Sequence, residues 1–348
     1  MKKTSVVGID FGRGVVRAAE VQDPTGPQPV LLRSHSLPLP PGSVVGGEVR
    51  NIDAVADVLK LLWGQAGFKT KKVVLGMGNQ RVLVRELAVP KVPLDRIRES
   101  LPFQVQDLLP VPVGDALLDF YPIADGEADG QPVINGLLVA AVRGAVESNV
   151  EAAVAAGLDP VAVDLIPFAL TRALLPLGDD SHSALVHIGA TTTSVVFVDG
   201  GVPQFVRIIP AGGDDVTRAL VTRFDIEPSE ADRKKRELGL GKPSSADDRA
   251  TVEVMFETTG ELLTSLRNTF AFYLNTRSLT GLDRIVLSGG GAQLDGLSTA
   301  LGEVSRLPVE VVDPASGFTL ADTVDATVFG DKRGDYAVAL GLTLRSAA

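Results

Sequence analysis

Short hydrophobic runs that end in glycine-rich turns recur along the chain. The first reads SVVGIDFG from residue 5 and leads through a further glycine into VVRAAEV. Another, ALVHIGATTTSVVFVDGG, spans residues 184–201. Apolar runs bounded by turn residues are typical of buried strands, so each stretch predicts two strands joined by a glycine turn. Such a turn is either an ordinary hairpin connection with polar residues or a cradle for phosphate.

The first half of the chain looks like a weak copy of the second half. Alignment of IDFG with VHIG pairs Asp10 with His187 and Gly12 with Gly189. Further along, KKVVLGMGNQ matches DRIVLSGGGAQ, again as a strand that ends in glycines. Strands followed by glycine turns are common in α/β proteins, but two matches in the same order are harder to attribute to chance. We therefore expect two related α/β halves that face each other across a cleft lined by these turns.

Helices are predicted where apolar residues recur at helical spacing. One covers residues 51–66, with Asn51 or Asp53 as its N-cap. The same pattern predicts helices over 95–108 and 247–277, and a helix in 144–160 that is ended by Gly157 and Pro160.

Two segments have no counterpart in the other half. The first runs from about residue 87 to 158 and holds a helix, an extended stretch, the polar turn DGEADGQP and the strand INGLLVAAV. We expect it to form a small α/β subdomain around the acidic turn. The second, 214–250, holds two helical pieces and the linker GKPSSADD, whose small and polar residues favour flexibility.

Composition and charge narrow the class of protein. The chain has 348 residues, 45% of them hydrophobic, which is enough for two or more cores. Its net charge is −10 and it has no basic tract, so no binding to nucleic acid is expected. It has no cysteine, which excludes disulfides, thiolate metal sites and a cysteine nucleophile. No apolar run approaches the roughly 18 residues of a membrane span, so we expect a cytoplasmic protein without direct membrane insertion.

The glycine turns supply the chemistry of a phosphate site. Glycine lets the backbone bend sharply and point N–H groups at phosphate oxygens, as expected for Gly12 and Gly14. Asp10 ends the strand before that turn, in a place where a carboxylate holds hydrated Mg²⁺. The threonines of HIGATTTS add hydroxyl donors, IPAGGDDV places two glycines before a helix, and LSGGGAQL contains three glycines. Each motif alone is weak, but the four in this order predict a nucleotide site.

With these motifs the chain resembles the actin-like ATPase superfamily, which includes actin, chaperone ATPases, sugar kinases and FtsA. GIDFG is similar to its first phosphate motif, HIGATTTS to its second and SGGGAQL to its adenosine motif. The stretches VVRAAEV, VPKVPLDRIRESLPFQVQDLLPVPVGDALLDFYPI and SEADRKKREL resemble the PilM family of type IV pilus assembly proteins. The resemblance covers essentially the whole chain. It implies an α/β, actin-like fold, which is a duplicated ribonuclease H-like fold of two domains, with an FtsA-type inserted subdomain.

The resemblance also implies where the domains begin and end. The expected parts are a first actin-like domain (1–88, 158–183 and the C-terminal helix 333–348), an inserted subdomain of the FtsA/PilM type (89–157), a second actin-like domain (184–214 and 283–332), and a helical subdomain that closes the nucleotide cleft (215–282).

The family's nucleotide contacts carry over to matching positions of this chain, and they imply ATP or ADP with Mg²⁺ as ligands. Asp10 is the expected metal position, and Arg17 replaces the family's usual lysine. A surface cation is the alternative for Arg17, and a solvated helix face is the alternative for Asp232 and Lys235. The implied contacts are Asp10, Gly12, Arg13, Gly14 and Arg17 at the first phosphate turn, Gly189, Ala190, Thr191 and Thr192 at the second, Gly212 and Gly213 near the sugar, Asp232 and Lys235 near ribose and adenine, and Gly289, Gly290 and Gly291 at the adenosine loop.

Two positions depart from the family's pattern. The second phosphate motif normally begins with an aspartate, and this chain has His187, whose imidazole is a poor ligand for Mg²⁺ because that ion prefers hard oxygens. Active chaperone-type members carry a glutamate before the residue that matches Pro167, and this chain has Ile166, which neither orients water nor accepts its proton. Both changes predict binding of nucleotide with little or no hydrolysis. A core histidine bonded to backbone is the alternative role for His187.

The resemblance implies an interaction scaffold. It would be a cytoplasmic, actin-like component of the type IV pilus assembly machinery that docks the cytoplasmic N-terminal peptide of the inner-membrane partner PilN. The implied groove lies between the inserted subdomain and the first domain. That partner would recruit the protein to the inner face of the cytoplasmic membrane. Contacts with other pilus assembly proteins and self-association are implied in the same way.

Two other functions stay open, a slowly cycling ATPase and an FtsA-like division filament. For a sugar kinase, the sequence offers no convincing catalytic aspartate. FtsA-type proteins end in an amphipathic helix that anchors them to membrane. This chain ends in ALGLTLRSAA, which we expect to lie in the final domain helix.

Overall fold

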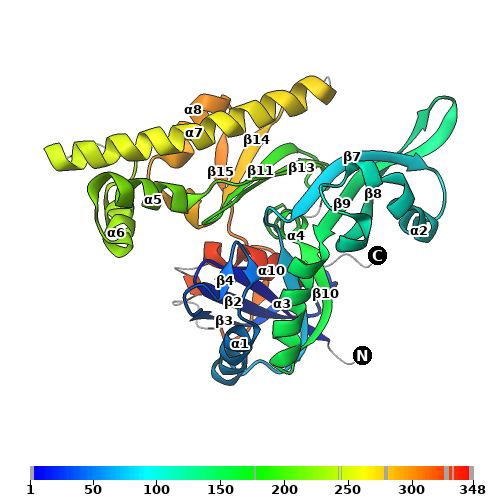
Figure 1. Ribbon diagram of the computed structural model, residues 1–348, viewed down its shortest axis with the longest axis horizontal. Helices are drawn as coiled ribbons and strands as arrows, with labels where there is room; N and C mark the ends of the chain where they lie inside the picture. The colour runs from blue at the N-terminus through cyan, green and yellow to red at the C-terminus, as the bar shows by residue number, and fades with distance from the viewer. Residues whose placement is uncertain are drawn as a thin grey trace.

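The first of two large sheets has six strands in the order β10-β6-β1-β2-β3-β16. The structure is a computed structural model (Figure 1), and it describes residues 4–175, 178–241, 243, 245–277, 281–324, 329–330 and 333–344. β1 runs antiparallel to β2 and parallel to β6, as expected for a glycine hairpin followed by a crossover. The strands are β1 (Ser5–Gly12), β2 (Val15–Gln22), β3 (Val30–Pro38), β6 (Lys72–Met77), β10 (Asp159–Leu165) and β16 (Thr319–Leu320).

The second large sheet repeats this arrangement with five strands in the order β13-β12-β11-β14-β15. β11 is antiparallel to β12 and parallel to β14, so β11, β12 and β14 occupy the places of β1, β2 and β6. The repeat that the sequence predicted is therefore confirmed at the level of strand order and direction. The strands are β11 (His182–Ile188), β12 (Thr193–Asp199), β13 (Val202–Ile209), β14 (Arg284–Ser288) and β15 (Val309–Val311).

Two helices, α4 (Ile166–Leu174) and α10 (Ala337–Thr343), lie between the sheets (Figure 1). Their buried side chains, among them Leu170 and Leu342, share one hydrophobic cluster with Leu185 of β11. The helices approach so closely that a Cβ on Gly341 would overlap the carbonyl of Ala169. Because protein interiors are close-packed, this contact fixes the position of the two sheets relative to each other.

The first sheet is covered on its other side by α1 (Ile52–Ala66) and α3 (Arg143–Ala155). Of the two predicted N-caps for α1, the structure selects Asn51, whose side chain accepts a hydrogen bond from the Ala54 N–H at 3.1 Å. The helix predicted in 144–160, with Gly157 and Pro160 as its ending signals, runs from Arg143 to Ala155, and the chain turns at Gly157 before it enters β10. A short hairpin, β4 (Val44–Val45) and β5 (Glu48–Val49), precedes α1.

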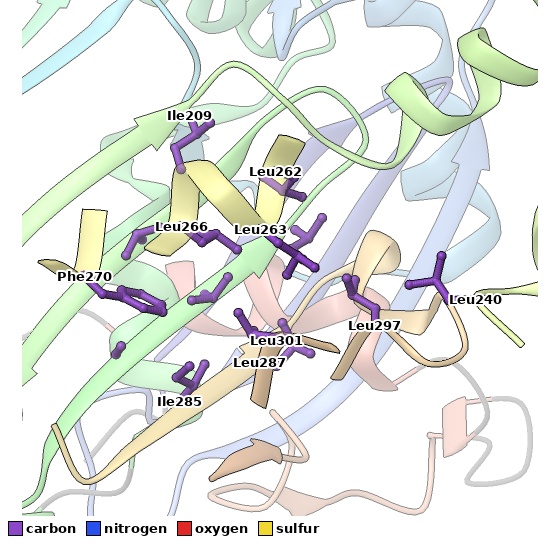
Figure 2. Close-up of a cluster of buried hydrophobic side chains, with 14 of the residues drawn as sticks. Ile209, Leu240, Leu262, Leu263, Leu266, Phe270, Ile285, Leu287, Leu297 and Leu301 are labelled. Atoms are coloured by element: carbon purple, nitrogen blue, oxygen red, sulfur yellow. The ribbon is translucent and has the colours of Figure 1, made fainter. Parts of the chain in front are cut away.

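The second sheet is covered by α7 (Ala246–Arg277), a helix of 32 residues that runs along the top of Figure 1. Figure 2 shows Leu266 and Phe270 of α7 directed toward Ile285 and Leu287 of β14. Burial of this apolar face explains why a helix of mixed composition stays helical over such a length. The other helices of this half are α5 (Gly213–Phe224), α6 (Pro228–Leu238) and α8 (Leu297–Ser305).

The elements predicted around the acidic turn form a separate sheet of three strands, in the order β7-β9-β8. It has its own hydrophobic cluster, in which Ile97 and Leu101 of the adjoining helix meet Phe120 and Leu138 of the sheet. The elements are β7 (Val82–Pro90), α2 (Leu94–Gln104), η1 (Gln106–Leu108), η2 (Val113–Asp115), β8 (Ala116–Ala128) and β9 (Gln131–Val142).

The domain limits expected from the sequence stay a prediction, and three elements lie elsewhere than we expected. β7, most of which we assigned to the first actin-like domain, pairs with β9 in the three-stranded sheet. α3, which we assigned to the inserted subdomain, packs on α1 and β10 of the first half. β16, which we assigned to the second domain, pairs with β3. Of the expected helix 333–348, the structure describes η4 (Arg333–Tyr336), α10 and one following residue, and 345–348 lie outside the described residues. Residues 242 and 244 of the expected linker lie outside them as well.

Within the described ranges, no helix is both long enough and apolar enough to cross a lipid bilayer.

Candidate functional site

A cavity of about 860 Å³ lies where the glycine turns of the two halves meet. Its wall includes the β1–β2 turn, the β11–β12 turn, the first turn of α5, one face of α6, and η3 (Gly290–Gln293). All the residues expected at a nucleotide site line this cavity except Gly212, and both departures from the family's pattern, His187 and Ile166, line it too. The structure thus brings together positions from distant parts of the chain, while their role in binding stays a prediction.

Gly212 lies behind the cavity wall. A Cβ at this position would lie 2.6 Å from the carbonyl oxygens of both Gly189 and Ala190, so the residue allows two turns to pack backbone to backbone. The Gly213 N–H donates to the Gly189 carbonyl at 2.9 Å, and the Asp214 N–H donates to the Ala190 carbonyl at 2.8 Å. We expected Gly212 and Gly213 to approach the sugar, at a helix start that receives an anion or a ribose. The structure corrects this expectation for these two N–H groups, because they already bind the neighbouring turn.

Arg13 joins the two halves across the cleft. Its Nε lies 2.7 Å from Asp214 Oδ2, and its Nη1 donates to Asp214 Oδ1 at 2.7 Å. Arg13 was expected at the phosphate turn, and Asp214 was not among the expected contacts. Burial raises the pKa of Asp214, and the Arg13 guanidinium opposes this rise. The acidic pair in IPAGGDDV was the only signal of this contact, and the sequence alone did not show that it faces Arg13.

Asp232 and Lys235 lie on the face of α6 that is turned to the cavity. Lys235 is 18% exposed, and its Nζ donates to Thr217 Oγ1 at 2.7 Å and to the Gly213 carbonyl at 3.1 Å. Asp232 accepts from Thr217 Oγ1 at 2.6 Å and from Lys235 Nζ at 3.1 Å. Burial alone would raise the pKa of Asp232, but these hydrogen bonds outweigh it and hold the pKa below its usual value. The pair therefore belongs to an ordered network beside the cavity and not to a solvated face.

Asp10 and Arg17 are direct cross-strand partners at the end of the β1–β2 hairpin. Burial raises the pKa of Asp10 to about 6, with Arg17 opposing the rise and Asp335 adding to it. Arg17 is 22% exposed, and its Nη2 lies 3.5 Å from Asp335 Oδ2. It is therefore part of the cavity wall and not a surface cation.

His187 occupies the corresponding strand position in the second half. Its cross-strand partner in β12 is Ser194, and its Nδ1 lies 3.3 Å from the hydroxyl of Ser288 in β14. Burial, followed by the charge of Arg17, lowers the pKa of His187 to about 4. The imidazole is therefore neutral near pH 7. It forms part of the cavity wall, and its hydrogen-bond partner is the Ser288 hydroxyl.

Ile166 begins α4 at the inner edge of the first sheet and lines the cavity. A Cβ on Gly78 would lie 2.8 Å from Ile166 Cβ, and one on Gly76 would lie 3.0 Å from Ile166 Cγ1. The two glycines of VLGMGN thus make room for the isoleucine. The position presents methyl groups to the cavity, and these neither orient a water molecule nor take its proton.

One wall of the cavity was not expected from the sequence. The loop from Leu39 to the β4–β5 hairpin contributes Pro40, Pro41 and several neighbours to the lining. The buried side chain of Asn149 in α3 holds this hairpin, because it accepts from the Val49 N–H at 2.8 Å and donates to the Gly47 carbonyl at 3.0 Å. The string LPLPPGSVVGGEV signalled a turn, but not that the turn faces the cleft.

The family and the fold of the chain are shown by its similarity to known proteins. The family model described as type IV pilus assembly protein PilM matches residues 8–347. A solved structure described as the PilM-PilN type IV pilus biogenesis complex is similar with a TM-score of 0.86 and 28% identity, over 98% of this chain and 98% of that one. The cell division protein FtsA of Bacillus subtilis is 21% identical over 309 residues, which cover 77% of this chain and 70% of FtsA. EutJ of Carboxydothermus hydrogenoformans is similar with a TM-score of 0.59 and 15% identity, over 99% of this chain and 91% of EutJ, which shows a shared fold.

Proposed function

This chain belongs to the type IV pilus assembly protein PilM family and has an actin-like fold, and on that premise we propose that it binds ATP or ADP in the cleft with little or no hydrolysis. In the same proposal it docks the cytoplasmic N-terminal peptide of PilN. The nucleotide acts as a structural ligand that holds the two halves at a fixed angle, and the partner brings the protein to the inner face of the cytoplasmic membrane.

The observation that carries the first part is the convergence of glycine turns on one cavity. Its volume of about 860 Å³ lies in the range of small-molecule pockets, which run from roughly 300 to 1,000 Å³. The described part of its wall has four cationic side chains, namely Arg13, Arg17, Lys235 and Arg236, whose N–H groups are of the kind that binds phosphate oxygens. MreB5 of Spiroplasma citri, solved with ADP, has the same fold at 13% identity and a TM-score of 0.51, over 97% of this chain and 94% of MreB5. The similarity to MreB5 supports the actin-like fold of this chain, and the cavity supports the proposal that the chain binds a nucleotide.

Weak hydrolysis follows from the two groups that face the expected γ-phosphate end. Hydrolysis needs a general base that accepts a proton from the attacking water, and the base must lie within hydrogen-bond reach of that water in order to orient it. Ile166 presents only hydrocarbon there. His187 stands where the family has an aspartate, and the lowering of its pKa to about 4 makes its imidazole a weak proton acceptor near pH 7.

The experiment for this part measures binding and turnover on the same sample. Saturating ATP at 100 times its Kd should stabilise the folded state by about 2.7 kcal/mol, seen as a rise in unfolding temperature. Phosphate release should stay at the buffer rate in the wild type. His187→Asp should raise it only slightly, because Ile166 still leaves the water unoriented. His182→Asp, at the start of the same strand, is the matched control. Turnover by the wild type well above the buffer rate contradicts the proposal of an inert site.

Docking of PilN rests on the family and on the similar PilM-PilN complex. The three-stranded sheet with α2 is the surface that we assign to it, at the groove expected between this sheet and the first half. Phe103 of α2 is 81% exposed, and an aromatic side chain so open to water is a typical interface anchor. Other pilus assembly proteins and further copies of this chain remain proposed partners of the same kind.

A labelled peptide from the cytoplasmic N-terminus of PilN tests the docking by fluorescence anisotropy. Wild type should bind it, and Phe103→Ser should weaken binding at least about tenfold, which is 1.4 kcal/mol. Val311→Ser is the control, because Val311 is also exposed but lies in β15 of the second sheet. Equal affinity of the two variants would remove Phe103 from the interface, and no binding by the wild type would refute the docking itself.

A further inference from the structure

Among the described residues, four carboxylates line the cavity, and side-chain cations hold three of them. Asp214 lies 2.7 Å from Arg13, Asp232 lies 3.1 Å from Lys235, and Asp335 lies 3.5 Å from Arg17. These cations belong to the chain and lie in or beside the wall of the same cavity. A divalent metal that used one of these acids would have to displace a fixed positive charge.

Asp10 is the one remaining acid, and the position that matches it in the second half holds an imidazole. Mg²⁺ prefers oxygen ligands in a near-ideal octahedron, so a second carboxylate at residue 187 would extend the site, and His187 does not. In the described part of the chain, His, Cys, Asp and Glu side chains form no group of three or more that would hold a metal ion. Beside a nucleotide, Mg²⁺ is usually held by one or two carboxylates together with the phosphates. Here the one such carboxylate, Asp10, is the cross-strand neighbour of the Arg17 guanidinium, so a divalent cation at Asp10 would lie beside a fixed positive charge. The residues present therefore do not fit the Mg²⁺ that we expected from the resemblance.

The Arg17 guanidinium lies where a positive charge is needed. A Cβ on Gly12 would lie 2.9 Å from Arg17 Nη1, so the guanidinium lies directly against the first phosphate turn. It is the cross-strand neighbour of Asp10, and its charge also acts on His187. A guanidinium offers several N–H donors in a planar fork that matches phosphate oxygens. It is thus suited to the task that a hydrated cation performs beside a diphosphate.

We propose that this chain binds nucleotide without a divalent cation, and that Arg17 supplies the positive charge at the diphosphate. The inference rests on the proposed nucleotide site and specifies how that site neutralises its ligand. It also predicts that Asp in place of His187 turns the site into one that prefers the metal complex.

The test compares the Kd of ADP, by isothermal titration calorimetry, in buffer with MgCl₂ and in buffer with EDTA. ADP is chosen because it chelates Mg²⁺ more weakly than ATP. The Kd should change by less than about threefold between the buffers. A Kd at least about tenfold weaker in EDTA would overturn the metal-free site and leave the proposed nucleotide function intact. No binding in either buffer would overturn both.

Two variants identify the residues responsible. His187→Asp should bind ADP at least about tenfold more tightly with MgCl₂ than with EDTA, whereas His182→Asp should behave like the wild type. Arg17→Met should weaken ADP binding at least about tenfold in EDTA, with Arg98→Met, on the distant α2, as its control. Circular dichroism confirms that each variant is folded. If folded Arg17→Met binds ADP like the wild type in EDTA, Arg17 is not the counter-charge.

Discussion

The two glycine hairpins share a strand arrangement and differ in the chemistry they carry. In the first, the cross-strand pair beside the turn is Asp10 and Arg17, and in the second it is His187 and Ser194. The first turn holds two residues between its last paired positions, and the second holds the four residues 189–192. Duplication has therefore kept the backbone plan and placed the charges in one half and hydroxyl groups in the other.

The hairpins also differ in how tightly their surroundings hold them. Around the second turn, a Cβ on Gly289 would overlap the carbonyl of Ile188, and one on Gly212 would lie 2.6 Å from two carbonyls. Around the first turn, a Cβ on Gly14 would meet nothing within 4 Å. The second turn is thus built into a packed cluster of backbone, while the first meets the Arg17 side chain at Gly12 and has open space at Gly14.

The largest effect is expected from Gly289→Ala, which tests this difference in packing between the two turns. Gly289→Ala places a Cβ into backbone at a φ of +96°, so we expect the free energy of unfolding to fall by about 3 kcal/mol or more. Gly14→Ala meets only the strain of a φ of +65°, about 1–2 kcal/mol. Urea unfolding of the two variants measures both values. Equal losses would mean that the two turns are held equally tightly.

The second prediction concerns Asp10 and His187, which should change the stability of the fold with pH in opposite directions. The pKa of Asp10 is raised in the folded state from 3.8 to about 6, so its ionisation destabilises the fold as the pH rises through that window. The pKa of His187 is lowered from 6.5 to about 4, so its protonation destabilises the fold as the pH falls from 6.5 to 4. In the wild type these two slopes offset each other.

Single variants should separate the slopes. Relative to the wild type, Asp10→Asn should gain stability as the pH rises from about 4 to 6, reaching on the order of 2–3 kcal/mol near pH 7. His187→Gln should gain relative stability in the opposite direction, as the pH falls from 6.5 to 4. Urea unfolding across this range gives both differences. Parallel pH profiles for the two variants would show that burial does not act on the groups in opposite senses.

A smaller effect tests the contact that joins the halves. Arg13 is about half exposed, so its ion pair with Asp214 should couple by about 1 kcal/mol in a double-mutant cycle of Arg13→Ala and Asp214→Asn. The exposed pair Lys60 and Asp57 on α1 is the control and should couple less. A coupling of zero for Arg13 and Asp214 would mean that this ion pair adds nothing to the contact between the halves.

The sequence predicted those parts of the molecule that depend on local pattern. Strand–glycine–strand units, the long helix and the inserted elements all have local signatures, and the order of motifs located the cleft. Contacts between distant segments have no such signature. Asp214 facing Arg13, Asn149 holding the β4–β5 hairpin, and β16 joining the first sheet each depend on how the chain closes in space. The first N–H groups of α5 were misjudged for the same reason, because their acceptors lie in another turn.

The central claim is that the cleft holds nucleotide and leaves it intact. The most direct measurement incubates the protein with ATP labelled at the γ-phosphate, isolates the complex by gel filtration, and identifies the bound nucleotide after several hours. We predict near-stoichiometric label recovered as ATP, in MgCl₂ and in EDTA alike. Label released as inorganic phosphate with ADP left on the protein, or a chain that carries no nucleotide at all, would contradict the account.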